Sequence, residues 1–340
     1  MANENEVKGK PPQAILGEMI NGYWVTQTIT AAARLGVADH LADGPKSVAA
    51  LAERVGAHAG SLYRLLRACA SIGIFSEDAS HAFSQTTLSE ALRSGVPGSM
   101  RGLAMMTGLL HMRAWPEILH SVRTGETAFK KVFGSEIFEH LPRDPEAARA
   151  FDEAMAGYSA STAAAVAAAY DFSKFATIVD VGGGSGALLG AILGRAPAAR
   201  GINFDLPHCA DRARAHFERL GQSARVEVQG GDFFASVPSG DAYTMKMILH
   251  DWDDERSIAI LRNVRKAIAP GGTLLVLETV IPPGNTPSSG KLLDINMLVM
   301  TGGRERTEAE FASLYRAAGF ELTRVIPAHP AASVIEGRPV

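Results

Sequence analysis

The chain has 340 residues, which is more than one ordinary hydrophobic core accommodates and predicts at least two domains. Hydrophobic residues make up 46% and charged residues 20%, so the composition excludes a disordered chain. The formal net charge of -3 gives no overall attraction to nucleic acid or to an acidic membrane.

Cysteine content and the pattern of apolar runs predict the compartment. Cys69 and Cys209 are the only cysteines and lie far apart in the chain, which argues against a disulfide framework or a structural zinc site and suits a reducing compartment. The first residues, MANENEVKGKPPQ, are polar, and no apolar run approaches the roughly 20 residues that cross a bilayer. We therefore expect a soluble, cytoplasmic protein that binds no membrane.

The N-terminal third has a helical pattern. Residues 1–13 are predicted to be a disordered tail. Apolar residues then recur at helical spacing over 14–41, and two short capped helices are predicted within 47–56 and 62–73. Two short extended runs follow them, so residues 14–95 have the outline of a winged helix.

The rest of the chain changes from a helical to an alternating pattern. Residues 96–170 are predicted to be a helical connector, and 171–340 to be a separate domain. Apolar, partly β-branched runs alternate there with helical segments, which predicts an α/β fold with a mostly parallel, seven-stranded sheet of the Rossmann-like type. The seven runs are TIVDVGGG, ARGINFDLP, ARVEVQGGD, DAYTMKMIL, GTLLVLETV, FELTRVIP and ASVIEGRPV.

A glycine-rich turn follows the first of these runs. A strand that ends in glycines and leads into a helix brings free backbone N–H groups close to a ligand. Gly182, Gly184 and Gly186 form G-x-G-x-G, unlike the G-x-G-x-x-G of dinucleotide sites, and Asp180 stands two residues before them. A carboxylate there repels a pyrophosphate but attracts a cationic amino group. The charge pattern favours S-adenosylmethionine, which has an ammonium and a sulfonium, over NAD.

Acidic residues also end the next two strand runs. Asp205 ends the second run, where a carboxylate accepts from both ribose hydroxyls of a nucleoside. Asp232 ends the third run and is predicted to accept from the adenine amino group, while Phe233 is predicted to stack on the adenine ring. Each acid alone is more often a helix cap or a surface charge, but acids at three consecutive strand ends indicate one nucleoside site.

A histidine ends the fourth run, on the edge of the sheet where doubly wound folds carry out chemistry. Methyl transfer from a sulfonium requires an oxygen nucleophile, such as that of a phenol. A phenol is mostly protonated at neutral pH, so a base must take its proton. His250 is our candidate general base, because an imidazole with an ordinary pKa near 6.5 is largely neutral and available at that pH. Glu278, at the end of the fifth run, is the nearest candidate to orient the ring. Glu305 is a second candidate, although surface ion pairs with Arg304 or Arg306 would also explain it.

With these residues assembled, the chain resembles the S-adenosylmethionine-dependent O-methyltransferases of the plant caffeate and flavonoid type. It is more similar to their bacterial relatives that act on polyketide and antibiotic phenols in secondary metabolism. The resemblance spans nearly the whole chain and rests on motifs in order: LYRLLR with GIF, VDVGGGSG, INFDLPH, GGDFF, KMILHDWDD and GGRERTEAEF. It implies a methyl transfer from S-adenosylmethionine, leaving S-adenosylhomocysteine, to a hydroxyl of a small aromatic acceptor, without a metal ion.

The resemblance also implies roles for individual residues. His250 would be the general base, framed by Glu278 and Glu305, and Asp251 would help to hold the acceptor hydroxyl. The residues that it places at the cofactor are Gly182, Asp205, Asp232, Phe233 and Lys246.

Two departures from the plant pattern concern the acceptor pocket, which we expect the helical connector, 96–170, to form together with the catalytic, S-adenosylmethionine-binding domain, 171–340. Met247 stands where the plant enzymes usually have a tryptophan, and Met300-Thr301 stands where they have asparagine-proline. These differences argue against the plant acceptors. Ordinary core packing is at least as good an explanation for the residues that we propose as the pocket lining, which are Trp115, Phe138, Met155, Met247, Met297 and Met300.

A winged helix also suggests DNA binding, but the charges oppose it. Residues 1–100 contain eight Lys or Arg and nine Asp or Glu, a net charge of -1, and DNA affinity depends on neutralising phosphates. The family that the chain resembles uses this domain to dimerise. We therefore expect a homodimer, in which each N-terminal domain helps to close the acceptor pocket of the partner. Two alternatives remain: a cofactor-binding family member with changed chemistry, such as hydroxylation, and a DNA-binding regulator.

Overall fold

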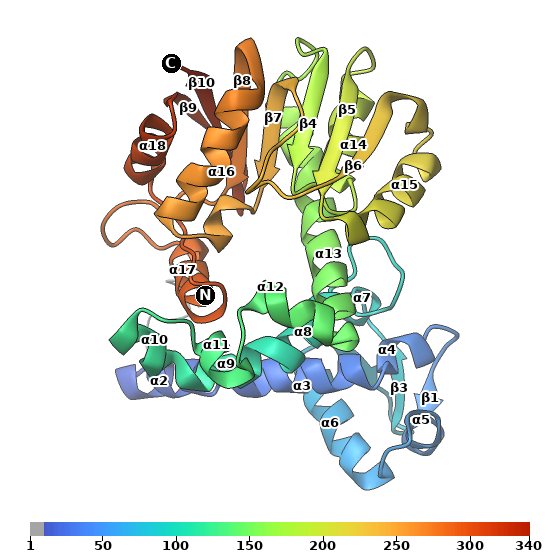
Figure 1. Cartoon of the computed structure of the whole chain (residues 1–340). Coiled ribbons are helices and arrows are strands. Elements are labelled where there is room, and N and C mark those ends of the chain that lie inside the picture. Colours follow the sequence, from blue (N-terminus) through green and yellow to red (C-terminus); the bar gives the residue numbers. More distant parts are fainter. Residues whose placement is uncertain (1–9) are drawn as a thin grey trace. The chain divides into compact units, whose positions relative to one another are not determined.

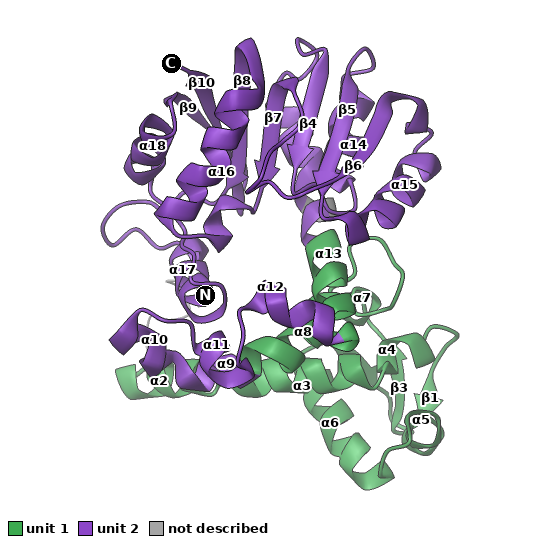
Figure 2. Ribbon diagram, in the orientation of Figure 1, with its two compact units in different colours: residues 1–112, 145–157 green, residues 113–144, 158–340 purple. Residues whose placement is uncertain are grey.

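The computed structural model describes residues 10–340. The chain forms two compact units: residues 1–112 with 145–157, and residues 113–144 with 158–340 (Figure 2). The domain boundaries that we predicted at 95 and 170 follow the sequence pattern and do not coincide with this division. In the described part of the chain, no helix is long and apolar enough to cross a membrane.

Unit 1 contains the predicted winged-helix outline. A three-stranded sheet in the order β1-β3-β2 packs with helices around the buried side chains of Leu51, Leu66 and Phe83. The elements are α2 (Pro12–Ile20), α3 (Gly22–Arg34), α4 (Val37–His40), β1 (Lys46–Ser47), α5 (Val48–Val55), α6 (Ala59–Ser71), β2 (Phe75–Glu77), β3 (Ala82–Gln85), α7 (Thr87–Glu90), α8 (Arg101–Met106) and the π-helical turn η1 (Thr107–His111).

Two predictions for the N-terminal segment need correction. Most of the predicted tail, 1–13, lies outside the described residues, but Pro12 already begins α2, a position where the fixed φ of proline suits a helix. The continuous helical pattern of 14–41 is divided into α2, α3 and α4. Gly36, with a φ of 64°, separates α3 from α4 because it adopts the left-handed conformation that other residues avoid.

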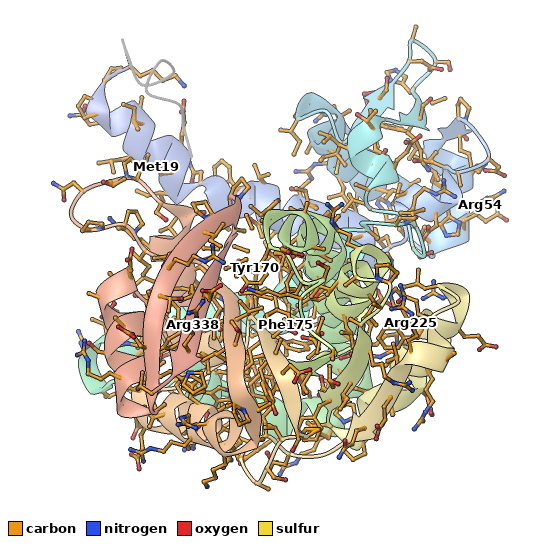
Figure 3. All side chains as sticks on the ribbon, turned by 90° about the horizontal axis from the view of Figure 1, so that it is seen from above. Met19, Arg54, Tyr170, Phe175, Arg225 and Arg338 are labelled. Atoms are coloured by element: carbon orange, nitrogen blue, oxygen red, sulfur yellow. The ribbon has the colours of Figure 1, made fainter. Side chains whose placement is uncertain are left out.

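Residues 112–169 are helical and belong partly to each unit. The elements are α9 (Met112–Ala114), η2 (Trp115–Glu117), α10 (Ile118–Thr124), α11 (Ala128–Phe133), α12 (Ile137–His140), η3 (Leu141–Arg143) and the long α13 (Pro145–Ala169). The predicted connector is therefore helical, as expected, but broken into short pieces before α13. At the end of α13, Tyr170 stacks parallel to Phe175 at 6.4 Å between ring centroids, and Figure 3 labels both residues.

Unit 2 contains the predicted α/β sheet of seven strands in the order β6-β5-β4-β7-β8-β10-β9 (Figure 1). The strands β4 to β8 pair in parallel, and β10 pairs antiparallel with both β8 and β9. The fold class is confirmed. The strands are β4 (Thr177–Val181), β5 (Arg200–Asp205), β6 (Val226–Gly230), β7 (Gly240–Lys246), β8 (Ile268–Glu278), β9 (Phe320–His329) and β10 (Ala332–Pro339).

Helices cover both faces of this sheet. Alternate residues of β8 separate the two sides: Leu275 and Leu277 belong to one apolar cluster, with α13, α14 and α15, and Leu274 and Val276 to the other, with α16 and α18. The helical elements are α14 (Ala187–Arg195), η4 (Pro207–Cys209), α15 (Ala210–Arg219), η5 (Ser223–Arg225), η6 (Leu249–Asp251), α16 (Asp254–Ala267), α17 (Ser289–Met300) and α18 (Glu308–Ala317). The carboxyl ends of β4, β5, β6, β7 and β8 therefore lie along one edge, where the predicted site residues gather.

Candidate active site

The glycine-rich turn after β4 has the backbone that its sequence predicts. Gly182, Gly184 and Gly186 all have positive φ, of 69°, 54° and 80°. A Cβ on Gly186 would lie 2.4 Å from the ring of Phe217, whereas a Cβ on Gly184 would meet nothing within 4 Å. Gly186 is thus required by packing as well as by conformation, and Gly184 leaves its surroundings open.

Asp205 holds this turn to the end of β5. Its Oδ2 accepts the N–H of Gly184 at 2.7 Å, and its Oδ1 accepts the N–H of Leu206 at 2.6 Å. The side chain is half-buried. The carboxylate therefore lies at the turn, where the sequence placed a ribose-binding residue.

Asp180 lies deeper than we expected. It is buried, and its Oδ1 accepts from Thr244 on β7 at 2.7 Å. Burial raises the pKa of Asp180 to about 7, against the hydrogen bond from Thr244 and the charge of Lys246, which lower it. Asp180 supports the turn from below and does not face solvent.

Two buried acceptor atoms beneath the turn lack partners among the described residues: Oδ2 of Asp180 and Oδ1 of Asn203. A Cβ on Gly183 would lie 2.4 Å from the Asn203 oxygen and 3.0 Å from the Asp180 oxygen, so only glycine leaves this space open. Acceptors without donors suit a ligand that carries an ammonium and hydroxyl groups. The donor and acceptor set of this site fits S-adenosylmethionine.

The predicted adenine-binding residues form the next part of the edge. Asp232 is exposed, and its Oδ1 accepts the N–H of Phe234 at 2.8 Å. Phe233 is half-buried, with its ring 5.0 Å from that of Phe234 and 6.3 Å from that of Trp252. The amide of Asn263 donates to the carbonyls of Phe233 and Phe234, which fixes this short loop.

Lys246 ends β7 between two buried acids. Burial lowers the pKa of its ammonium to about 8, while the charges of Asp180 and Glu278 act in the opposite direction. The residue that follows, Met247, has a positive φ of 54°, which is uncommon for a residue with a side chain. The chain therefore turns sharply between the end of β7 and the segment that carries His250.

His250 pairs with Glu305. Nδ1 of the imidazole lies 2.6 Å from Oε1 of Glu305, and the two residues are 4% and 3% exposed. A carboxylate only accepts, so Nδ1 carries the proton and donates it. In the neutral ring, Nε2 then has the free lone pair that a general base needs.

Glu278 contacts the backbone of this segment and not the ring. Its Oε1 accepts the N–H groups of Ile248, Leu249 and His250 at 3.1, 2.7 and 3.2 Å. Our order of the two glutamates was wrong in this respect, since Glu305 contacts the imidazole and Glu278 holds the loop. The alternative explanation for Glu305, a surface ion pair with Arg304 or Arg306, is not found among the described residues, because both arginines pair with Asp254.

Asp251 is the second acid beside the imidazole. Its Oδ1 lies 3.8 Å from Nε2 of His250. Burial raises the pKa of Asp251 to about 6. A polar cavity of about 210 Å³ opens beside it, lined also by Trp252, Asp253 and Arg256.

The surrounding acids change the charge of the imidazole. Burial alone lowers the pKa of His250, but the negative charge of Asp251, the hydrogen bond with Glu305 and the charges of Glu305 and Glu278 together raise it to about 9. We expected an ordinary pKa near 6.5. That expectation was wrong, because the sequence does not show that three carboxylates surround a buried ring.

The proposed acceptor-pocket residues fall into both units. Met155 belongs to unit 1, and the other five belong to unit 2. Trp115 donates from Nε1 to Oδ1 of Asn296 at 3.0 Å, and the ring of Phe138 lies 5.5 Å from that of Trp252. Met297 and Met300 are buried at the end of α17. These contacts are compatible with a pocket and with core packing, and the pocket assignment stays a prediction.

Several residues of the site were missed from the sequence. Trp252 packs against Phe138, Phe233 and Phe234, and Arg306 contacts the segment around His250. Both stand next to residues that we had selected, within HDWDD and GGRERT, so reading the whole motif would have found them. Among residues 10–340, no group of three or more His, Cys, Asp or Glu side chains could hold a metal ion.

Comparisons with known proteins cover the whole chain. Residues 18–95 match the O-methyltransferase dimerisation domain, and residues 115–321 match the O-methyltransferase domain. The phenazine O-methyltransferase PhzM of Lysobacter antibioticus is 50% identical over 341 residues, which is 100% of both chains.

Two solved structures extend this likeness. The crystal structure of LaPhzM superposes with a TM-score of 0.94 at 50% identity, over 97% of this chain and 100% of that one. The O-methyltransferase NcsB1 from neocarzinostatin biosynthesis, solved with S-adenosylmethionine and 2-hydroxy-5-methyl naphthoic acid, is 35% identical with a TM-score of 0.81, over 93% of this chain and 96% of that one.

Proposed function

Because this chain belongs to the O-methyltransferase family and carries that family's dimerisation domain, we propose that it methylates a hydroxyl of a fused aromatic, phenazine-like acceptor with His250 as general base. Two predictions from the sequence are confirmed: the protein is an S-adenosylmethionine-dependent O-methyltransferase, and its relatives act in secondary metabolism. The acceptor and the base are the parts that we propose.

The acceptor class rests on the relatives and on the chemistry of the side chains. A relative that is 50% identical along its whole length is a phenazine O-methyltransferase, and NcsB1 was solved with a naphthoic acid. Both acceptors are flat, fused rings. Phe138, Trp252 and Met247 supply aromatic and thioether surfaces of the kind that pack against such rings.

The single observation that supports His250 as the base is its buried pair with Glu305. Donation from Nδ1 to Glu305 fixes the ring and leaves Nε2 to accept the proton of the acceptor hydroxyl. The bound cofactor supplies an electrophilic methyl group on a sulfonium. As the acceptor oxygen bonds to this methyl group and the carbon–sulfur bond breaks, the hydroxyl proton passes to Nε2.

The raised pKa of His250 has a consequence for the order of events. With a pKa of about 9, the imidazole of the unliganded protein is protonated at neutral pH and cannot act as a base. A cation bound at the same edge of the sheet favours the neutral ring, because like charges repel. We infer that cofactor binding produces the basic form of His250.

The test is turnover by His250→Ala with S-adenosylmethionine and a hydroxyphenazine. We expect kcat to fall by about 10²- to 10⁴-fold, the usual contribution of a general base, while cofactor affinity by calorimetry stays close to that of the wild type. His81→Ala is the matched control, since His81 is an exposed residue of unit 1. Turnover by His250→Ala equal to that of the wild type would falsify the role as base.

The mass of the product decides the reaction type in the same experiment. O-methylation adds one CH2 unit to the acceptor and requires consumption of S-adenosylmethionine. Addition of one oxygen atom would instead indicate the hydroxylation alternative.

We also propose that the chain forms a homodimer through unit 1. Large apolar side chains are exposed on α2 and the start of α3, including Ile20 at 70% and Trp24 at 57%, and Met19 is labelled in Figure 3. A second copy that covers this surface would bury them. Trp24→Glu should shift the mass measured by light scattering from dimer to monomer, and an unchanged dimer would remove α2 and α3 from the interface. Closure of the partner's pocket and a cytoplasmic location stay predictions.

A further inference from the structure

The segment that carries His250 is irregular, so its backbone groups need partners from elsewhere. After β7 the chain makes one 3₁₀ turn, η6, before α16 begins at Asp254. Glu278 accepts three of the N–H groups of this segment. The carbonyl groups on the other side of the turn are bound by Arg306.

The guanidinium of Arg306 is buried and hydrogen-bonded through all of its nitrogens. Nη1 donates to the carbonyl of Leu249 at 3.0 Å, and Nη2 donates to the carbonyl of Trp252 at 3.0 Å. Nε and Nη2 both donate to Oδ1 of Asp254, at 3.0 and 2.8 Å, and Nη2 also donates to Oγ of Ser257 at 3.2 Å. Arg306 is 1% exposed, which makes it an unusually buried charge. Its contacts with the carbonyls of Leu249 and Trp252 bracket His250 and Asp251 in the sequence.

The neighbouring residue contacts the ring of the same histidine. Glu305 and Arg306 are consecutive, and their side chains reach different targets: the imidazole of His250 and the backbone on either side of it. The chain that carries them is fixed at both residues, because the N–H of Glu305 donates to Asp294 and the carbonyl of Arg306 accepts from Ile281.

Gly303 permits this close approach. A Cβ at Gly303 would lie 2.0 Å from the carbonyl oxygen of His250 and 2.6 Å from the nitrogen of Trp252. The two backbones are thus in direct contact just before Glu305, which leaves the segment little freedom to shift.

We propose that Arg306 is a positioning residue for His250: it holds the carbonyls of Leu249 and Trp252 so that the ring reaches Glu305 with Nε2 free. This inference rests on the proposed role of His250 as base. Arginine suits the position because its planar group has five donors in a fixed fork, whereas a lysine ammonium is a single point with three donors. Lysine would keep the charge opposite Asp254 and lose part of the backbone contacts.

A double-mutant cycle separates positioning from general stability. Four proteins are compared: wild type, Arg306→Lys, His250→Ala and the double variant. If Arg306 acts through His250, Arg306→Lys lowers kcat by about 10- to 100-fold in the wild-type background, the scale of a small displacement of a reacting group. It then has almost no further effect in the His250→Ala background. Equal losses in both backgrounds would overturn the proposal.

Arg304→Lys is the matched control. Arg304 lies two residues earlier, is half exposed and also pairs with Asp254, at 3.5 Å. We expect it to leave kcat unchanged. A loss equal to that of Arg306→Lys would show that the pairing with Asp254, and not the hold on the backbone, is responsible.

A spectroscopic readout makes the test independent of the proposed function. NMR of protein with isotopically labelled histidine reports the Nδ1–H proton of His250, whose strong bond to Glu305 shifts its resonance. Arg306→Lys should move or broaden this resonance. If His250→Ala keeps full turnover, the general-base role fails while this arm still decides the positioning. An unchanged resonance together with unchanged kcat would refute the role of Arg306 itself.

A second variant covers the case in which Arg306→Lys does not fold. Asp254→Asn removes a charged partner of the guanidinium from a side chain that is 55% exposed, so the fold should tolerate it. We expect a smaller loss of kcat, again present with His250 and absent in His250→Ala. The same loss in both backgrounds would count against the proposal.

Discussion

Nδ1 of His250 and Oε1 of Glu305 are 2.6 Å apart although 55 residues separate them in the chain, and both side chains are shielded from solvent. Their hydrogen bond determines which nitrogen of the imidazole carries the proton in the neutral ring. It also puts a full negative charge beside a group that gains a positive charge when it takes a proton.

The first prediction concerns Glu305. Glu305→Gln keeps the size of the side chain and removes its charge, so the protonated imidazole loses a stabilising partner. We expect kcat to fall by about 10- to 10³-fold, less than or similar to losses at other histidine-orienting acids, with cofactor affinity unchanged. Steady-state kinetics and calorimetry measure both. Glu308→Gln, at the exposed start of α18, is the control, and equal kinetics of the two variants would contradict the prediction.

The second prediction concerns pH. Because the pKa of His250 is raised to about 9, the imidazole of the unliganded enzyme loses its proton only as the pH rises through that value. Only the neutral ring can act as the proposed base. We therefore expect kcat/KM for S-adenosylmethionine, which reports the unliganded enzyme, to increase with pH and to level off above about pH 9.

Asp251 provides the comparison for this profile, because its charge is the largest influence that raises the pKa of His250. In Asp251→Asn the midpoint of kcat/KM should move to lower pH. The same acceptor is used for both proteins, so ionisation of the acceptor affects both profiles equally. A midpoint that does not move would show that Asp251 does not influence the imidazole.

Deprotonation of His250 should lower the free energy of unfolding as the pH rises, although it raises kcat/KM. A histidine whose pKa is raised on folding stabilises the folded protein fully below its unfolded pKa of about 6.5. This contribution is lost as the pH rises through the folded value of about 9. The difference in the free energy of unfolding between pH 6 and pH 9, measured by urea titration, should therefore be smaller for Asp251→Asn than for the wild type.

The third prediction concerns Asp205. Asp205→Asn should weaken binding of S-adenosylmethionine by about 10- to 100-fold, since a hydrogen bond to a charged group contributes about 1.5–3 kcal/mol. The change also weakens the bond that holds Gly184. Calorimetry measures the affinity. Asp211→Asn, on the exposed side of α15, is the control, and unaltered affinity of Asp205→Asn would remove Asp205 from the cofactor site.

The fourth prediction separates two reasons for glycine in the turn. Gly184→Ala and Gly186→Ala both force alanine into the left-handed region, at a cost of about 1–2 kcal/mol each. Only at Gly186 does the new Cβ meet the ring of Phe217. Gly186→Ala should therefore lower the free energy of unfolding by about 1–3 kcal/mol more than Gly184→Ala, the range for overpacking. Equal values from urea titrations would show that Phe217 moves aside freely.

The sequence was sufficient to predict the strands and to select His250 as a candidate site residue. All seven apolar runs form strands, but His250, which we expected at the end of the fourth strand, lies four residues beyond β7 in the turn η6. The position of the last two strands was not predictable from the pattern: β10 lies between β8 and β9 and runs antiparallel to both. Apolar periodicity records which residues are buried but not which strand is the neighbour.

The partner of His250 could not be chosen from the sequence for a physical reason. Glu305 lies between two arginines, and such a run of charges is usually solvated. In the folded chain all three charges diverge: Glu305 and Arg306 are buried, and Arg304 stays exposed. Burial of a charge depends on contacts between distant segments, and neighbouring residues do not reveal it. The same limit applies to the pKa of His250.

The opposite directions of the Glu305 and Arg306 side chains have an evolutionary consequence. With Gly303 in place, loss of one residue before Glu305 would bring the guanidinium of Arg306 to the imidazole, and gain of one residue would bring the carboxylate of Glu305 to the carbonyl oxygens of Leu249 and Trp252. Both new pairings are repulsive. Insertions and deletions in these few residues should therefore be eliminated even where single substitutions are tolerated, so that the length of this segment is inherited more strictly than its composition.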